Sequence, residues 1–294
     1  MIETITEILK PDFLLHNALC ASVLMGVVCP LVGAYFVLRR LVFWGVALPQ
    51  IAASGISFAF LLQGLGFTLL AGSEAQERHL AIIASALFTF AAIAMLLFME
   101  RKGKGAAEGR IGVFYALAWA TSILFVSTNA TGETEMTSLL RGEIIAISPH
   151  DFHIMLMFFA LAGLAALVFQ KEFLLVSFDR DMAVTLGRKV LAWEVLLYLL
   201  IGTAISLGVM TAGPLVTFGL LVVPPMAALP WAGGIMSLSL VAAALGGLSA
   251  FVGFYFSYAK DMPLGPVIIC AACAALIISA GARKAYMLLA RIKA

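Results

Sequence analysis

The sequence predicts an all-α, polytopic transmembrane helical bundle, and we expect residues 1–294 to form one domain. Three observations predict this fold class. Of the 294 residues, 63% are hydrophobic and 12% are charged, which is about half the charged fraction of a soluble domain. Apolar runs long enough to cross a bilayer recur along the whole chain. The charged residues are gathered in the short segments between these runs.

Nine apolar segments approach or exceed the roughly 20 residues that a spanning helix needs. Pro49 in the second segment and Pro214, Pro224 and Pro225 in the seventh predict kinks or breaks. The sixth and seventh segments lie close enough to merge, so we expect eight or nine spans. The predicted spans, in chain order, are 13–38, 46–71, 80–99, 111–128, 152–170, 190–209, 212–230, 234–257 and 264–281.

The charges between the spans predict an orientation. If the N-terminus lies outside, the cytoplasmic segments hold 14 of the 18 Lys and Arg residues, and ten of the 16 Asp and Glu residues lie outside. The positive-inside rule therefore favours a multi-pass protein in contact with membrane lipid, with an external N-terminus and a cytoplasmic C-terminus. Since no basic stripe occurs outside these short segments, we expect no nucleic-acid partner.

The longest charged interruption with a helical pattern is residues 171–190. Asp179 is a suitable N-cap and Gly187 a suitable stop for a short helix between them. One face of this helix would be apolar, formed by Phe178, Met182 and Leu186 with Ala183 beside them. A short amphipathic helix between two spans either lies on the lipid headgroups or docks a soluble partner.

The sequence contains none of the usual energy-coupling sites of a transporter. It has no G-x-x-x-x-G-K-[S/T] phosphate loop, and no span carries a charge at its centre that would mark a proton or sodium relay. Glu194 lies about one turn inside a span, where it can reach the membrane surface or pair with Arg188 or Lys189. Because no Ser/His, paired Asp or H-E-x-x-H arrangement occurs within spans, we expect no enzyme activity. The energy for transport would then come from another chain.

Four motifs in order resemble the membrane permeases of the zinc/manganese/iron ABC importers, over about residues 30–281. Residues 30–40 resemble the family's first span, which ends in Arg39-Arg40. Asp181, Ala183 and Gly187 match its D-x-A-x-x-x-G helix. Residues 213–224 resemble its G-x-L-hydrophobic-Pro span, and residues 261–266 its D-x-P-x-G-P turn.

This resemblance implies a fold similar to the vitamin B12-type importers, in the cytoplasmic membrane of a prokaryote. It implies a homodimeric permease with two cytoplasmic ATP-binding subunits and an extracytoplasmic metal-binding protein. ATP would be bound by the partner subunit, so this chain would hold no cofactor. The implied ATPase-coupling residues are Asp181, Met182, Ala183 and Gly187, and the implied pathway residues are Gln50, Pro224 and Asp261.

The sequence departs from the family after the double arginine. Where the family typically has an Asp and a His on the metal route, this chain has Val46 and Gln50. An amide oxygen is a weak ligand for Zn²⁺ and merely acceptable for harder cations. Either a delivery protein binds most of the metal, or the permease moves a metal chelate or another small solute. An ion-coupled secondary transporter is the alternative from a different class.

Overall fold

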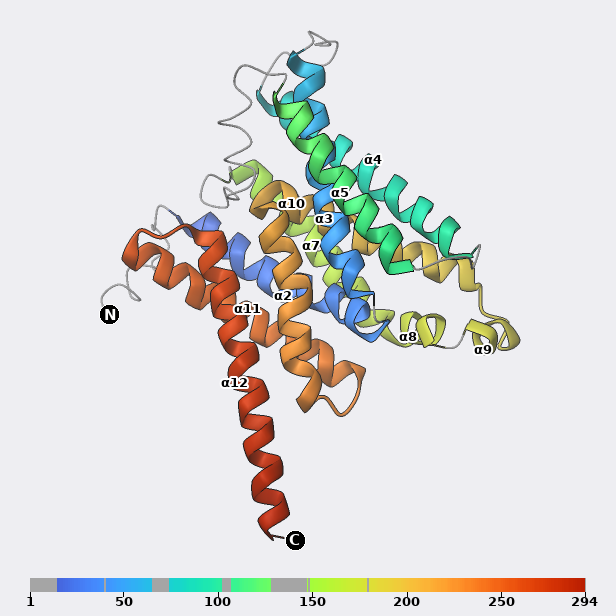
Figure 1. The fold of residues 1–294 in the computed structure, drawn as a ribbon, viewed down its shortest axis with the longest axis vertical. Coiled ribbons are helices and arrows are strands. Elements are labelled where there is room, and N and C mark those ends of the chain that lie inside the picture. The colour runs from blue at the N-terminus through green and yellow to red at the C-terminus, as the bar shows by residue number, and fades with distance from the viewer. Residues whose placement is uncertain are drawn as a thin grey trace.

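The computed structural model describes residues 15–39, 41–64, 74–101, 107–127, 147, 149–178 and 180–293, and it is built from helices (Figure 1). In chain order these are α2 (His16–Leu38), α3 (Val42–Gly64), α4 (Glu74–Arg101), α5 (Ala107–Ser127), α7 (Pro149–Val168), α8 (Gln170–Phe178), α9 (Arg180–Thr185), α10 (Val190–Ala228), the 3₁₀ turn η2 (Leu229–Trp231), α11 (Ile235–Lys260) and α12 (Leu264–Lys293).

The spanning helices largely match the predicted segments. Within the described ranges, seven helices are long and apolar enough to cross a membrane, and α7 with α8 forms an eighth candidate that is bent by 67°. The helix α10 counts once among the seven, although its 39 residues would extend for about 58 Å if straight, nearly twice the thickness of a bilayer core. Its shape decides whether the bundle has eight or nine crossing segments.

Helix α10 folds back on itself at Gly213. This glycine has φ 80° and ψ 167°, which lies outside the helical region, and Pro214 follows it. A methyl group placed on Gly208 would lie 2.9 Å from Cγ2 of Thr217, whereas nine residues of straight helix span about 13.5 Å. The two limbs, 190–212 and 214–228, therefore run side by side as two spans, as the sequence predicted.

The other prolines do not end their helices. Helix α3 continues through Pro49, and the second limb of α10 continues through Pro224 and Pro225. The predicted break is thus confined to Gly213, because only there does the backbone leave helical geometry. A proline removes one hydrogen bond, but neighbouring helices in a bundle hold the segment straight enough to continue.

Helix α2 lies at the centre of the bundle and packs against α7, α10 and α11. It crosses α11 at two glycines. A methyl group on Gly26 would lie 2.6 Å from the carbonyl oxygen of Gly246, and one on Gly246 would lie 2.1 Å from that of Gly26. The two backbones touch here, which is how small residues hold helices together where water is absent.

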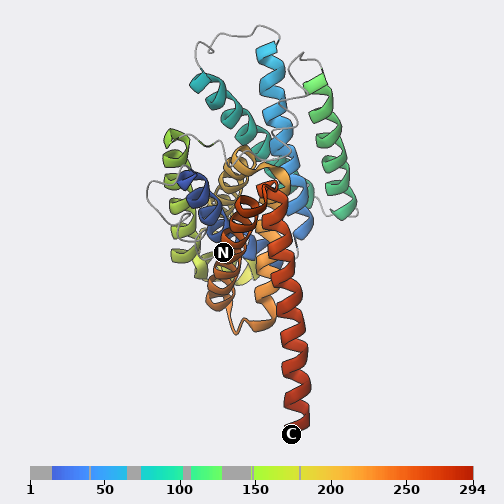
Figure 2. The same ribbon diagram turned by 90° about the vertical axis from the view of Figure 1, so that its left-hand side faces the viewer.

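Helix α12 is longer than predicted and reaches Lys293 instead of ending near residue 281. Its second half projects away from the other helices in both ribbon views (Figures 1 and 2). The apolar run ends near 281, but the residues after it (Ala-Arg-Lys-Ala-Tyr-Met-Leu-Leu) are mostly strong helix formers that continue the same helix. The predicted span was shorter than the helix because hydropathy was used to set its end, and a helix can continue beyond an apolar run.

Candidate docking segment and membrane pathway

The charged segment that the sequence singled out forms two short helices, α8 and α9, after a 67° bend at Phe169. We call residues 170–189 the docking segment. Val176 and Ala183 of this segment form a small core with Val190, the first residue of α10. Ala183 is fully buried, at 0% exposure, whereas its neighbour Met182 is exposed. Only a small side chain fits between the two valines, which explains an alanine at this position.

The end of α9 follows the prediction. Gly187 has φ +70°, its N–H bonds to the carbonyl of Val184 at 2.9 Å, and the N–H of Arg188 bonds to that of Ala183 at 3.0 Å. This pair of bonds is a Schellman motif, in which glycine takes the left-handed position. The predicted cap, Asp179, lies outside the described residues.

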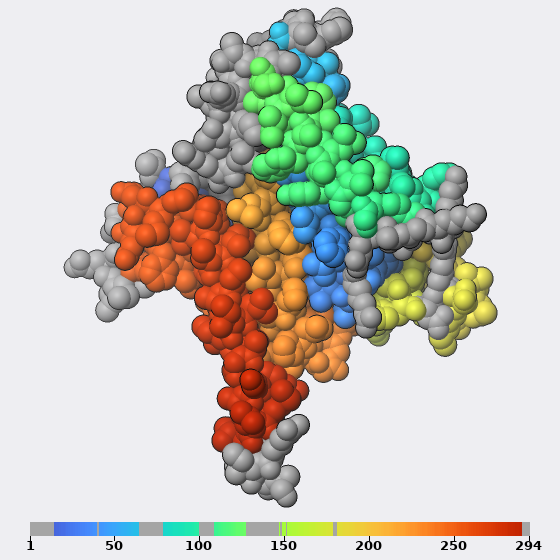
Figure 3. All heavy atoms as spheres, viewed as in Figure 1, coloured from blue at the N-terminus to red at the C-terminus, as the bar shows by residue number. Residues whose placement is uncertain are grey.

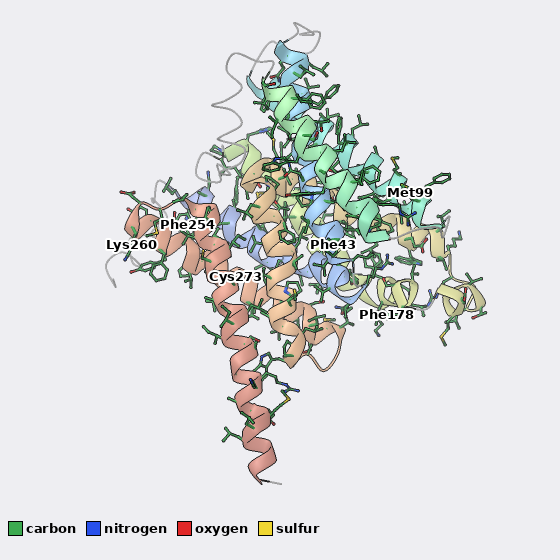
Figure 4. All side chains as sticks on the ribbon, viewed as in Figure 1. Phe43, Met99, Phe178, Phe254, Lys260 and Cys273 are labelled. Atoms are coloured by element: carbon green, nitrogen blue, oxygen red, sulfur yellow. The ribbon has the colours of Figure 1, made fainter. Side chains whose placement is uncertain are left out.

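The docking segment carries apolar side chains that are more than half exposed. Phe178, Met182 and Leu186 are 61%, 51% and 58% exposed, and Asp181 beside them is also exposed. Phe178 ends α8 instead of belonging to α9, but it remains on the outer side of the molecule (Figure 4). In the space-filling view, α8 and α9 form the right-hand edge of the face shown (Figure 3).

Arg39, at the end of α2, attaches the docking segment to the bundle. Its Nε donates to Oγ of Ser177 on α8 at 2.8 Å, and its Nη1 donates to the hydroxyl of Tyr198 on α10 at 2.9 Å. The sequence marked Arg39 only as half of a double arginine, and Arg40 lies outside the described residues. Its contacts bridge 138 and 159 positions of the chain, which no local pattern encodes.

A second polar link lies on the outer side of the segment. Arg188 Nη1 lies 3.3 Å from Oε1 of Glu172 on α8. Arg188 therefore forms an ion pair with Glu172. Both members are partly exposed to solvent, so this pair contributes little to stability.

Gln50 precedes Ser54 and Ser57 by one and two helical turns of α3. Ser54 Oγ is 2.8 Å from Thr121 Oγ1 and Ser57 Oγ is 3.2 Å from Ser122 Oγ. Gln50 itself is 5% exposed. Hydroxyl pairs therefore join α3 to α5, one and two turns beyond the buried Gln50.

Pro224 is buried in the second limb of α10, where α2 passes very close. A methyl group on Gly33 would lie 1.8 Å from the carbonyl oxygen of Leu221. That carbonyl has no helical partner, because Pro225 lacks the N–H that would bond to it. The first and third family motifs thus meet at one point, where the absent side chain of Gly33 leaves room for a carbonyl freed by proline.

Asp261 lies in the turn between α11 and α12, next to Lys260 at the left edge of Figure 4. It is exposed, has φ 50°, and its N–H bonds to the carbonyl of Ser257. Aspartate is one of the few residues that adopt this left-handed conformation readily. The structure thus gives Asp261 a role in the turn and shows no contact between it and Gln50.

No metal site is evident in the part of the chain that the structure describes. There, no three His, Cys, Asp or Glu side chains lie close enough together to hold a metal ion. The buried polar side chains of the same ranges are all Ser, Thr or Gln.

The described bundle of long apolar helices defines a multi-pass membrane protein. The chain belongs to the ABC 3 transport family, whose sequence pattern matches residues 12–282.

Three curated relatives align over most of both chains. The probable iron transport system membrane protein of Haemophilus influenzae is 26% identical over 92% of this chain and 89% of its own. The manganese import system permease protein ScaB of Streptococcus gordonii is 25% identical over 95% of each chain. The zinc transport system membrane protein TroC of Treponema pallidum is 27% identical over 88% of this chain and 85% of its own.

Two solved structures share the fold. PsaBC from Streptococcus pneumoniae, in complex with Fab, superposes with a TM-score of 0.79 at 23% identity and covers 95% of each chain. An inward-facing transporter described as metal-chelate type superposes with a TM-score of 0.67 at 14% identity, over 90% of this chain and 85% of its own. The predicted all-helical ABC permease fold is confirmed.

Proposed function

We propose that this chain is the permease subunit of an ABC importer that carries a divalent transition metal of the manganese, zinc and iron class across a prokaryotic cytoplasmic membrane. Membership of the ABC 3 transport family is the observation that carries this proposal. Relatives named for iron, manganese and zinc transport support the substrate class. Two copies of the chain would form the pathway, and an extracytoplasmic binding protein would deliver the metal.

A separate ATPase subunit would supply the energy, because the chain has no phosphate loop of its own. The described spans also bury no charged side chain that could relay a proton or sodium ion. The permease itself would therefore catalyse no reaction. It would be switched between outward-open and inward-open states by rigid-body movement of its helices.

The docking segment is the surface that fits the ATPase. Met182 and Leu186 supply exposed apolar area for a groove on the partner, and Asp181 supplies one charge beside them. The aromatic cluster of Phe169, Phe173 and Trp193 backs the segment, so that a push on α9 reaches the bundle instead of being absorbed locally. Placing the apolar face of an amphipathic helix in a hydrophobic groove of the partner is a common mode of protein recognition.

Two substitutions test the docking surface. Gly187→Val forces a β-branched residue into the left-handed region, at a cost of about 1–2 kcal/mol, and should loosen the end of α9. Asp181→Lys reverses the charge beside the apolar surface. Both should abolish ATP-driven Mn²⁺ uptake in proteoliposomes that contain the full complex, while the protein still inserts into the membrane. Gly187→Asn and Asp181→Asn are the matched controls, and we expect both to retain most uptake.

Normal uptake by Gly187→Val and Asp181→Lys would exclude this segment as the docking site. Uptake by the wild-type chain that persists without ATP and collapses with an ionophore would instead identify an ion-coupled secondary transporter.

A metal chelate is the second candidate substrate, and one observation favours it. At positions 46 and 50, where the family has an acid and an imidazole, the chain has an aliphatic residue and an amide, so these two positions supply no strong metal ligand. Stimulation of ATP hydrolysis by Mn²⁺, Zn²⁺ and Fe²⁺, each added alone, distinguishes the two substrates. A response to any bare ion supports the metal. If only a chelated form is transported, the chelate is the substrate.

A further inference from the structure

Arg39 joins three helices through one side chain. Besides its hydrogen bonds to Ser177 on α8 and Tyr198 on α10, its guanidinium carbon lies 5.5 Å from the centre of the Tyr198 ring. Ser177 in turn donates its hydroxyl proton to the carbonyl of Phe173, which leaves its oxygen free to accept from Arg39. The planar, forked guanidinium suits two acceptors in different directions, whereas an ammonium group would not hold both in fixed geometry.

A fourth helix is reached through Tyr198. Its ring stacks on that of Trp44, with centres 6.0 Å apart and planes inclined by 26°, and both residues are buried. Trp44 lies in the first turn of α3, the helix that carries Val46 and Gln50 within the next two turns. A continuous set of contacts therefore runs from the docking segment, through Arg39 and Tyr198, to the helix of the predicted pathway.

The residues of this contact set are held in place by further contacts, so a movement of α8 can be passed on to the other helices. Arg39 follows the last residue of α2, and its backbone N–H still bonds to the carbonyl of Tyr35 at 3.0 Å, so its Cα is fixed. Tyr35 is itself fixed to α7 by a hydrogen bond to the carbonyl of Ala166 at 3.1 Å, and its ring packs edge-on against Phe173 of α8. Charge-assisted hydrogen bonds in a partly buried site are stronger and more directional than those at the surface.

We propose that Arg39 is a positioning residue that couples displacement of the docking segment to displacement of α3 and of the first limb of α10. This inference rests on the proposed function, in which an ATPase acts on that segment. Without Arg39, the ATPase would still dock and hydrolyse ATP, but α8 would move without carrying the pathway helices with it. The defect would appear in the ratio of metal transported to ATP hydrolysed.

The test uses the full complex of permease, ATPase subunit and binding protein in liposomes, with Mn²⁺ and Zn²⁺ as probes. Three quantities are measured for each variant: ATPase subunit retained on the purified permease, ATP hydrolysed, and metal taken up. For Arg39→Ala we expect normal retention and hydrolysis, with metal uptake per ATP lowered about tenfold, the factor that one charge-assisted hydrogen bond typically contributes to an equilibrium. Arg39→Lys should be intermediate, because it keeps the charge and loses the fork.

Arg283→Ala is the matched control. Arg283 on α12 also lies over aromatic rings, 5.7 Å from the centre of Trp231 and 5.8 Å from that of Tyr286, but it does not contact the docking segment. We expect its uptake per ATP to equal that of the wild type. If Arg39→Ala fails to fold, Tyr198→Phe takes its place, because it removes one acceptor and keeps the stacked ring.

Wild-type uptake per ATP in both Arg39→Ala and Tyr198→Phe would overturn the proposal. Loss of the ATPase subunit from the Arg39→Ala complex would also overturn it, since Arg39 would then support docking and not transmission. A wild-type complex that hydrolyses no ATP and takes up neither ion would contradict the proposed function itself, which is a different result from a variant defect.

Discussion

At the residue scale, the structure explains why particular small residues occupy the positions of the family motifs. Gly187 is needed for a left-handed turn, Ala183 for a cramped core and Gly33 for contact with a carbonyl. The turn could be predicted from sequence, because a glycine after a short helix is a local signal. The other two could not, since each depends on a segment far away in the chain that only the folded bundle brings near.

Gly33→Ala tests the contact between α2 and the second limb of α10. Its new methyl group would lie 1.8 Å from the carbonyl oxygen of Leu221, and backbone atoms cannot move aside as a side chain can. We expect a loss of about 1–3 kcal/mol in stability, as for other overpacked cores, measured as a lower melting temperature in detergent. Gly112→Ala, where a methyl group meets nothing within 4 Å, should leave the melting temperature unchanged or raise it. Equal melting of both variants would exclude the close crossing.

At the element scale, hydropathy predicted where nearly every described helix lies. The break at Gly213 followed from the neighbouring Pro214, near the start of the seventh apolar run. The 67° bend between α7 and α8 did not, because Val168, Phe169 and Gln170 contain no helix breaker. Packing of Phe169 and Phe173 against Trp193 accounts for this bend, since it turns α8 toward the start of α10.

Gly213→Ala tests the hairpin in α10. A residue with φ 80° and ψ 167° lies in a region that is essentially reserved for glycine, so alanine should cost about 1–3 kcal/mol. The melting temperature and the fraction of protein that elutes as a single species from size exclusion should both fall. Gly281→Ala, in an open stretch of α12, serves as the control and should cause no loss. A Gly213→Ala protein as stable as this control would show that α10 does not need the turn.

The exposed surface of α9 gives a second test at this scale. Met182→Asp combined with Leu186→Asp removes the apolar area without touching the buried core of the docking segment. We expect the double variant to melt like the wild type and to lose the ATPase subunit during purification. Thr185→Asp, also exposed on α9, places one acid on the same helix without removing apolar area, and should retain more of the subunit. Full retention by the double variant would contradict docking through these side chains.

At the scale of the whole molecule, the described chain has two parts: the bundle of apolar helices and the exposed docking segment. Its buried polar groups are mainly hydroxyls and amides, several of which pair one helix with another, and the exposed helix α9 carries Asp181 and Met182 outside the bundle core. Charge and hydropathy predict the orientation and the span count. They do not predict the substrate, because Val46 and Gln50 stand where the family has an acid and an imidazole.

The most direct measurement is the sidedness of α9. The four cysteines are first replaced by alanine. In this background, Thr185→Cys provides a labelling site on α9, and Met262→Cys provides one in the turn between α11 and α12. A membrane-impermeant maleimide should label Thr185→Cys only in inside-out vesicles, and added ATPase subunit should protect it. Met262→Cys should react only in right-side-out vesicles. Labelling of Thr185→Cys from the outside would contradict an importer that is driven from the cytosol through this segment.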